Sequence, residues 1–178
     1  MEKIDAIFIS SLPDTDDFKP ILEGLDANLL VNPSRGKIRA MLRENFDRPL
    51  LIFGHGTERG VLTTDWKGYL IDGKMVDMLR KRKSIIGCWC FAGNFADKYG
   101  LHGFFTSMFI SNMDEALEFS FQTDAETISR ENAAFAKTLG KLIADGTPMS
   151  EWVGILQGEC HKDIPFVRYN YEAMVYYE

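Results

Sequence analysis

Cysteine is scarce in this sequence, which contains only Cys88, Cys90 and Cys160. Three is a small and odd number, so these cysteines do not form a disulfide framework. Long apolar runs are missing too, because no segment reaches the ~18–20 apolar residues that a membrane-spanning helix needs. The first residues contain no basic stretch followed by a long apolar run, so no signal peptide is expected. These absences favour a protein of the reducing cytoplasm that binds no membrane.

Positive charge is also in short supply. Lys and Arg together number 20 against 26 Asp and Glu, which gives a formal net charge of -6. The basic run at 80–83 lies between a helical pattern and a strand, so it is interpreted as a solvated helix end. An acidic chain offers little charge to pair with phosphate, so DNA, RNA and anionic membranes are not expected partners.

Two phosphate-binding motifs are absent. No Gly-x-Gly-x-x-Gly follows the first apolar run and no Walker-type loop occurs, so a flavodoxin-like or Rossmann-like small-molecule binder is only the third hypothesis. No internal repeat, low-complexity tract or linker-like stretch divides the chain. Its 178 residues are therefore expected to form a single domain over 1–178.

What the sequence does contain is a series of short apolar segments that alternate with segments of helical periodicity. The predicted strands are 4–9, 28–31, 49–55, 84–90, 104–110 and part of 166–177. The predicted helices are 14–25, 33–44, 72–82, 94–99, 124–144 and 149–156, and 56–68 is predicted as a loop. This alternation implies parallel pairing with right-handed crossovers. The predicted fold class is therefore α/β, a three-layer sandwich with a mostly parallel central sheet of about five or six strands.

Two of the apolar runs end in a reactive residue. The run 49–54 leads into His55-Gly56, and the run 84–89 leads into Cys90. Because loops beyond the carboxyl ends of neighbouring parallel strands line a shared crevice, the imidazole and the thiol are expected to meet there. A nucleophile and its base need hydrogen-bond reach of each other. The sequence therefore predicts a Cys-His dyad, with His55 as general base and Cys90 as nucleophile.

The surroundings of the two residues fit this chemistry. An imidazolium, or the start of a helix at 92–94, would lower the pKa of the Cys90 thiol and raise its thiolate fraction. Gly93 would let backbone donors approach a substrate carbonyl. Backbone N–H groups near Gly56 and Cys90 are expected to hold the oxyanion.

These motifs resemble the caspase-like cysteine peptidases, the superfamily of caspases, metacaspases, gingipain-type enzymes and CHAT domains. The stretch Cys90-Phe91-Ala92-Gly93 is similar to the Cys-x-Ser-Gly of metacaspases, with Ala92 in place of Ser. The segments 103–111 and 123–146 are similar to the strand and the long helix that follow the cysteine in CHAT domains. The resemblance covers about 4–157. It implies a bacterial peptidase acting on a peptide or protein substrate with no cofactor in the chemistry, although some relatives require calcium.

Cys88 marks a departure from this family. Metacaspases carry an acidic residue two positions before the nucleophile, so a preference for Arg or Lys is not carried over to this chain. Cys88 and Cys90 are two apart on a strand and are expected to face the same side. Cys88 is then a resolving thiol, a support for Cys90 or plain core, and it is also a candidate for substrate contact. A zinc site from Cys88, Cys90 and His55 lacks a fourth ligand, so no metal is expected.

Residues for substrate contact are predicted in two loops. Asp65 and Trp66 lie between the two dyad strands, where Trp66 is either a specificity wall or an aromatic that caps the core. Asn112 and Asp114 follow the next strand and are expected to open toward the same edge.

Outside the dyad the pattern indicates structural roles. Cys160-His161 is interpreted as a surface loop, and His102 as a turn residue. The tyrosines near the end are predicted to lie in a packed or intersubunit strand: Tyr169, Tyr171, Tyr176 and Tyr177.

Three functions therefore stand in order. The first is a caspase-like cysteine peptidase, the second a catalytically inactive caspase-like or CHAT-type module that binds a partner protein, and the third the flavodoxin-like binder. The second function is suggested by the small size of the chain and by Cys88, which stands where metacaspases carry an acidic residue.

Overall fold

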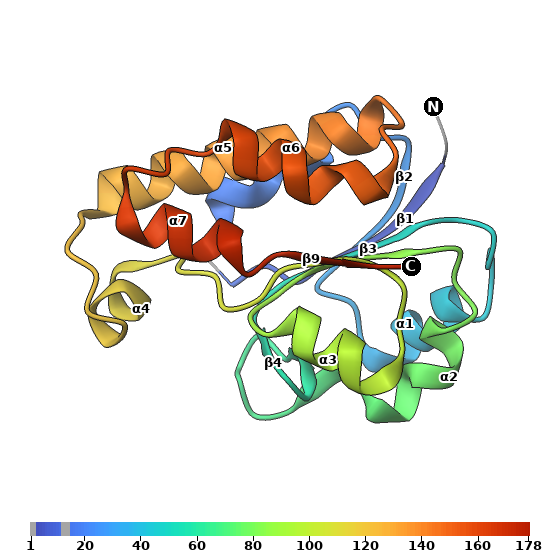
Figure 1. The fold of residues 1–178 in the computed structure, drawn as a ribbon. Helices are drawn as coiled ribbons and strands as arrows, with labels where there is room; N and C mark the ends of the chain where they lie inside the picture. Colours follow the sequence, from blue (N-terminus) through green and yellow to red (C-terminus); the bar gives the residue numbers. More distant parts are fainter. Residues whose placement is uncertain (1–2, 12–14) are drawn as a thin grey trace.

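A six-stranded sheet with the strand order β2-β1-β3-β7-β8-β9 forms the centre of the computed structural model, which describes residues 3–11 and 15–178 (Figure 1). Its strands are β1 (Ile4–Phe8), β2 (Ala27–Val31), β3 (Leu50–Phe53), β7 (Ile85–Cys88), β8 (Gly103–Phe105) and β9 (Val175–Tyr177). Every pair is parallel except β8 with β9. The predicted α/β class with a mostly parallel sheet is confirmed.

Helices cover both faces of this sheet (Figure 1). On one face lie η1 (Asp16–Leu22), α5 (Ala125–Ala144), η3 (Met149–Glu151), α6 (Trp152–Glu159) and α7 (Pro165–Glu172). On the other lie α1 (Arg35–Leu42), η2 (Gly73–Met75), α2 (Val76–Leu79) and α3 (Ala92–Tyr99), and α4 (Met113–Glu118) lies at one end of the first layer. This is the predicted three-layer sandwich. No helix within the described residues is long and apolar enough to cross a bilayer.

Alternation along the central strands divides the core in two. Leu51 and Phe53 of β3 face the α5 layer, whereas Leu50 and Ile52 face the α1–α3 layer. All four side chains are buried. Strands buried on both faces appear in sequence as continuous apolar runs, and this is why β1, β3 and β7 lie where such runs were predicted.

Polar side chains begin several helices at the predicted positions. The side chain of Ser34 accepts from Lys37 N–H, Asp72 accepts from Lys74 N–H, and Asp124 accepts from Thr127 N–H. Each of these caps satisfies one of the N–H groups that a helix start leaves without a carbonyl partner. The first predicted helix is instead the 3-10 helix η1, and Asp14, with which that prediction began, lies outside the described residues.

The segment predicted as a loop over 56–68 contains strands. β4 (Gly56–Thr57), β5 (Gly60–Leu62) and β6 (Tyr69–Asp72) form a separate antiparallel sheet. The guanidinium of Arg35 attaches this sheet to α1, since it donates to Tyr69 O at 2.8 Å and to the Asp72 carboxylate at 2.7 Å. The loop prediction was wrong because strands this short carry almost no period-two pattern.

The end of the chain agrees with the prediction in part. The strand expected within 166–177 is β9, which contains Tyr176 and Tyr177, whereas Tyr169 and Tyr171 lie in helix α7, which was not predicted. Pro165 occupies the first turn of α7, a position that proline favours. The predicted strand over 104–110 ends early, at Phe105, and α4 was not predicted.

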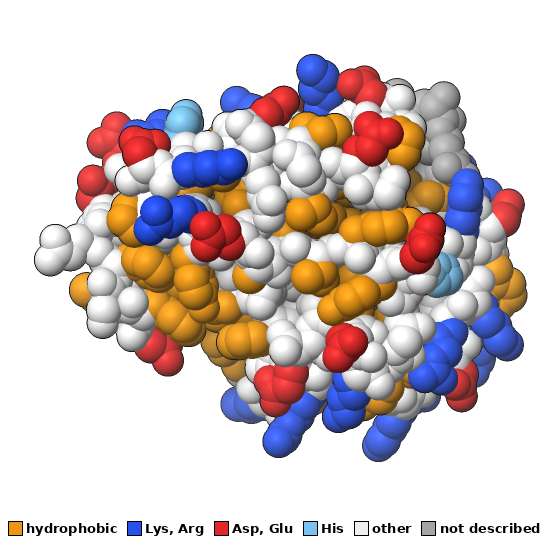
Figure 2. All heavy atoms as spheres, in the orientation of Figure 1, with side chains coloured by type: hydrophobic (Ala, Val, Ile, Leu, Met, Phe, Trp, Pro, Cys, Tyr) orange, Lys and Arg blue, Asp and Glu red, His pale blue; other side chains and the backbone are white. Residues whose placement is uncertain are grey.

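The basic run at 80–83 is not wholly solvated. Arg80, Lys81 and Lys83 are exposed, but the side chain of Arg82 is buried. Its guanidinium donates to the buried Asp5 carboxylate at 2.6 Å and to a backbone carbonyl at 2.8 Å. Figure 2 shows acidic and basic side chains interspersed over the face it presents.

Candidate active site

Strands β3 and β7 are adjacent and parallel, and their carboxyl ends lie level with each other. Phe53, the last residue of β3, is in register with Cys88, the last residue of β7. The pairing continues one step further, since Gly54 N–H donates to Cys88 O at 3.2 Å. His55 and Cys90 each follow two residues after a strand end, and both side chains line the same cavity.

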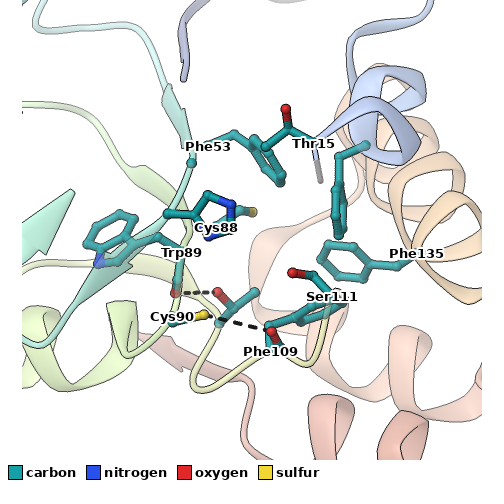
Figure 3. A pocket seen from close by; sticks show the side chains of 12 residues that line it. Thr15, Phe53, Cys88, Trp89, Cys90, Phe109, Ser111 and Phe135 are labelled. Atoms are coloured by element: carbon teal, nitrogen blue, oxygen red, sulfur yellow. Dashed lines mark hydrogen bonds between the residues drawn. The ribbon is translucent and has the colours of Figure 1, made fainter. Parts of the chain in front are cut away.

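The cavity is narrow and mostly apolar. Besides His55 and Cys90, it is lined by Thr15, Phe18, Phe53, Gly54, Cys88, Trp89, Thr106, Phe109, Ser111 and Phe135. Figure 3 shows the rings of Phe53, Phe109 and Phe135 around the cavity, while the indole of Trp89 points away from it. Its volume of about 30 Å³ is somewhat more than a single water molecule needs.

The imidazole of His55 is covered by Trp66. The two ring centroids are 4.8 Å apart with the planes tilted by 35°. The indole is 56% exposed, and the Nε2 atom of His55 is inaccessible to solvent. Trp66 does not cap the core, because its exposed indole lies against the His55 ring and does not line the cavity.

The thiol of Cys90 is held in its neutral form. Its Sγ donates to Phe109 O at 3.7 Å (Figure 3). Burial, with a smaller contribution from the nearby Glu115 carboxylate, raises the pKa of Cys90 to about 12. The sequence predicted a lowered pKa, and the structure gives the opposite direction.

The start of α3 does not supply the expected positive end to the thiol. Ala92 N–H donates to Trp89 O at 3.1 Å, and Gly93 N–H donates to Thr106 O at 2.9 Å. These two N–H groups are therefore already engaged. A Cβ on Gly93 would lie 3.0 Å from Val175 Cγ2, so this glycine serves the packing of α3 against β9.

A tight turn carries Cys90 from β7 into α3. Phe91 adopts φ 65° and ψ 24°, the left-handed region that a bulky residue rarely occupies. Such backbone outliers are concentrated at functional sites, where surrounding contacts hold them in place. The turn places Cys90 at the cavity instead of continuing the strand.

Gly56 does not line the cavity, and its N–H takes no part in the hydrogen bonds of the β4–β5 ladder. Leu62 N–H donates to His55 O at 2.9 Å, so Gly56 and its partner Val61 occupy a non-hydrogen-bonded position of the β4–β5 ladder. The N–H of Gly56 therefore points away from β5. Among the described residues no backbone carbonyl accepts from the N–H of Cys90.

Cys88, the last residue of β7, is buried in the core and also lines the cavity. Burial raises the pKa of its thiol far above the usual range. Within the described part of the chain, no three His, Cys, Asp or Glu side chains are grouped closely enough to hold a metal ion.

The acidic and amide residues predicted for substrate contact do not line the cavity. Asp65 is exposed, and its carboxylate accepts from Thr63 Oγ1 at 2.6 Å, a bond that lowers the pKa of Asp65. Asn112 caps α4 by accepting from Glu115 N–H at 2.9 Å, and Asp114 is exposed on the same helix. Their polar groups satisfy local backbone and turn geometry instead.

Ser111 occupies the place expected for Asn112 and Asp114. It lines the cavity, and both its N–H and its hydroxyl donate to Glu115 Oε2, at 2.7 and 2.9 Å. No signal in the sequence singles out Ser111 or the phenylalanines of η1, α5 and the segment after β8. Nothing in their spacing distinguishes them from ordinary core residues.

No protein-family model matches this chain, and no curated protein is significantly similar to it. The resemblance to caspase-like peptidases therefore depends on the sequence motifs around His55 and Cys90. What the chain does has to be argued from the cavity that these two residues share.

Proposed function

We propose that this chain is a caspase-like cysteine peptidase that hydrolyses a peptide bond in a peptide or protein substrate. The observation that carries the proposal is the convergence of His55 and Cys90 on one cavity at the carboxyl edge of β3 and β7. Ligand sites of open α/β sheets are found at this edge. A reducing cytoplasm would keep Cys90 and the neighbouring Cys88 as thiols.

The first half of the reaction forms a thioester. Because the thiol is neutral at rest, His55 removes its proton as the sulfur attacks the scissile carbonyl carbon. The negative oxygen of the tetrahedral intermediate accepts hydrogen bonds from the N–H groups of Gly56 and Cys90. The C–N bond then breaks, and the protonated His55 gives its proton to the departing amine.

Water completes the cycle. His55 removes a proton from a water molecule, which attacks the thioester carbonyl. The C–S bond breaks, the carboxylic acid leaves, and the sulfur takes the proton back from the imidazolium. Every step uses His55, Cys90, backbone donors and water, so the proposed chemistry requires no cofactor.

The resting cavity has to open for a substrate. At about 30 Å³ it does not admit a peptide segment, and the Cys90 thiol is directed at Phe109 O. Trp66 is the movable part of the entrance, since its exposed indole covers His55 from outside. We expect Trp66 to swing aside when a peptide binds.

Peptidyl acyloxymethyl ketones test the proposal. The sulfur of an active cysteine displaces the carboxylate leaving group and forms a stable thioether, which peptide mapping assigns to one residue. We expect labelling at Cys90 that is lost in Cys90→Ala and reduced at least about tenfold in His55→Ala, since general-base catalysis contributes at least that much. Cys160, a half-buried thiol remote from the site, is the internal control. Labelling of Cys160 alone, or no labelling, would refute the peptidase.

One observation favours the second function, a catalytically inactive module that binds a partner protein. The raised pKa of Cys90 and its bond to Phe109 O describe a thiol that also fits a purely structural role. The two functions differ in the Cys90→Ala variant, which would lose all peptidase activity but would retain the partner of a binding module.

A further inference from the structure

We infer that the cavity beside Cys90 accepts a small, uncharged side chain, so that the preferred substrate carries alanine or a residue of similar size before the scissile bond. This inference rests on the proposed peptidase function and adds the substrate class. It follows from the charge, the hydrogen bonding and the size of the cavity.

The walls offer no opposite charge to a substrate. Of the described residues that line the cavity, only His55 and the two thiols have ionisable side chains, and the rest are aromatic, hydroxyl or glycine residues. Glu115 does not line it, because its carboxylate lies behind Ser111 and accepts from that residue's N–H and hydroxyl. An ammonium or carboxylate entering this space would lose its water without gaining a partner, which is strongly unfavourable.

The hydroxyl groups of the walls are engaged with the protein. Thr106 Oγ1 donates to Trp89 O at 2.9 Å, and Thr15 Oγ1 donates to Ser10 Oγ at 3.2 Å. The Ser111 hydroxyl donates to Glu115. A substrate side chain that accepts a hydrogen bond would have to displace one of these bonds, whereas an apolar one leaves all of them intact.

Size is limited by aromatic rings that support one another. Phe18 packs against Phe53, Phe109 and Phe135, with ring centroids 4.8, 5.7 and 6.3 Å apart. Phe109 and Phe135 are 4.9 Å apart. A close-packed aromatic group resists expansion, because overpacking a well-packed core forces side chains out of their favoured rotamers and is destabilising. A methyl group fits the available volume, whereas a leucine or phenylalanine side chain does not.

Phe109 is the residue that sets this limit most directly. Its ring forms part of the wall and its carbonyl accepts from the Cys90 thiol, so the side chain and the nucleophile are held together (Figure 3). Shortening the side chain leaves the carbonyl in place and enlarges the cavity. Phe119, which directly follows α4, provides a matched control. Its side chain is exposed and does not line the cavity.

The test is a series of acyloxymethyl ketones acetyl-Ala-Ala-X that differ only in X, with X as Ala, Leu, Phe, Asp or Lys. We expect the Ala probe to label Cys90 at least about tenfold faster than any other member, a ratio within reach of a pocket that excludes a few carbon atoms. In Phe109→Ala the Leu probe should gain at least about tenfold relative to the Ala probe, and Phe119→Ala should leave the order unchanged.

The outcomes separate this inference from the proposed function. Fastest labelling of Cys90 by the Asp, Lys or Phe probe would overturn the small, uncharged preference and leave the peptidase intact. Failure of every probe to label Cys90 would overturn both. The wild-type series alone decides the preference if Phe109→Ala does not fold.

Discussion

Cys90, the proposed nucleophile, is a neutral thiol in the resting structure. The thiol is enclosed among phenylalanines and directed at a carbonyl, and both features stabilise the protonated sulfur. The proposed reaction accordingly makes His55 a general base during attack and does not use a preformed thiolate. This is the mechanism of a serine hydrolase carried out with sulfur.

The raised pKa makes a direct prediction for the alkylation of Cys90. Because the pKa moves from 9.0 to about 12, the thiolate fraction at pH 7.5 is about a thousandfold below that of an ordinary thiol. Iodoacetamide, a small reagent that needs no binding site, should therefore react with Cys90 about a thousandfold more slowly than with an ordinary thiol. The rate should continue to rise about tenfold per pH unit above pH 9, as measured by mass spectrometry. A rate that levels off below pH 9 would contradict the account.

Glu115 contributes part of this shift. Its carboxylate is a like charge for a thiolate, so Glu115→Gln should lower the pKa of Cys90 and speed iodoacetamide alkylation about twofold to tenfold. Glu118→Gln, an exposed residue of the same helix, is the control and should leave the rate unchanged. An equal acceleration in both variants would assign the effect to general surface charge.

At the scale of elements, the β3–β4 turn and the β7–α3 turn are packed against each other. A Cβ on Gly56 would lie 2.6 Å from Gly60 O and would collide with the indole of Trp89. The glycine that follows His55 is therefore required by the Trp89 side chain that precedes Cys90. The two halves of the site are held together by this contact.

Gly56→Ala should therefore lower the free energy of unfolding by about 1–3 kcal/mol, the usual cost of overpacking. Gly154→Ala is the matched control, because Gly154 lies in α6 with open space where its Cβ would be. That substitution should stabilise the protein by about 0.5–1 kcal/mol through helix propensity. Urea denaturation measures both, and an unchanged Gly56→Ala midpoint would show that the turn adapts.

The parts of the fold and the site that could be predicted are those that a short stretch of sequence specifies by itself. Strands β1, β3 and β7 are continuous apolar runs, and α5 has both a cap at Asp124 and a long apolar stripe. The placement of His55 and Cys90 at one edge follows from those strands alone. The phenylalanines of the cavity come from η1, α5 and the segment after β8, so their convergence depends on how helices pack on the sheet.

Aromatic residues explain why helix α7 was not predicted. The segment 166–177, part of which was predicted as a strand, is rich in tyrosine and phenylalanine, which favour strands. Its buried residues are Phe166, Val167, Asn170 and Tyr171, which is the spacing of a helix face. Helical periodicity outweighs strand propensity here, because α7 has to cover the sheet beside α6.

At the scale of the whole molecule, a buried ion pair anchors the sheet at the end opposite the site. Asp5 lies near the start of β1, and its carboxylate accepts from Arg82 Nη2 at 2.6 Å. Asn28 of β2 also donates to Asp5, at 3.0 Å. The pair therefore connects the edge strand, the centre of the sheet and the segment that leads into β7.

Removing one partner of this pair should cost more than any surface substitution. Asp5→Ala leaves the Arg82 guanidinium buried without its carboxylate and should lower the free energy of unfolding by about 3–5 kcal/mol. Asp77→Asn, which removes an exposed partner of Arg80, should change it by less than about 1 kcal/mol. Equilibrium urea unfolding compares the two. A loss in Asp5→Ala no larger than that in Asp77→Asn would show that the pair is not structural.

The most direct measurement of the central claim is a crystal structure of the protein after reaction with the acetyl-Ala-Ala-Ala acyloxymethyl ketone. The account predicts a thioether at Cys90 Sγ, an imidazole of His55 within hydrogen-bond reach of the adduct, and a carbonyl oxygen that accepts from the N–H groups of Gly56 and Cys90. An adduct on another cysteine, or one at Cys90 that faces away from His55, would contradict it.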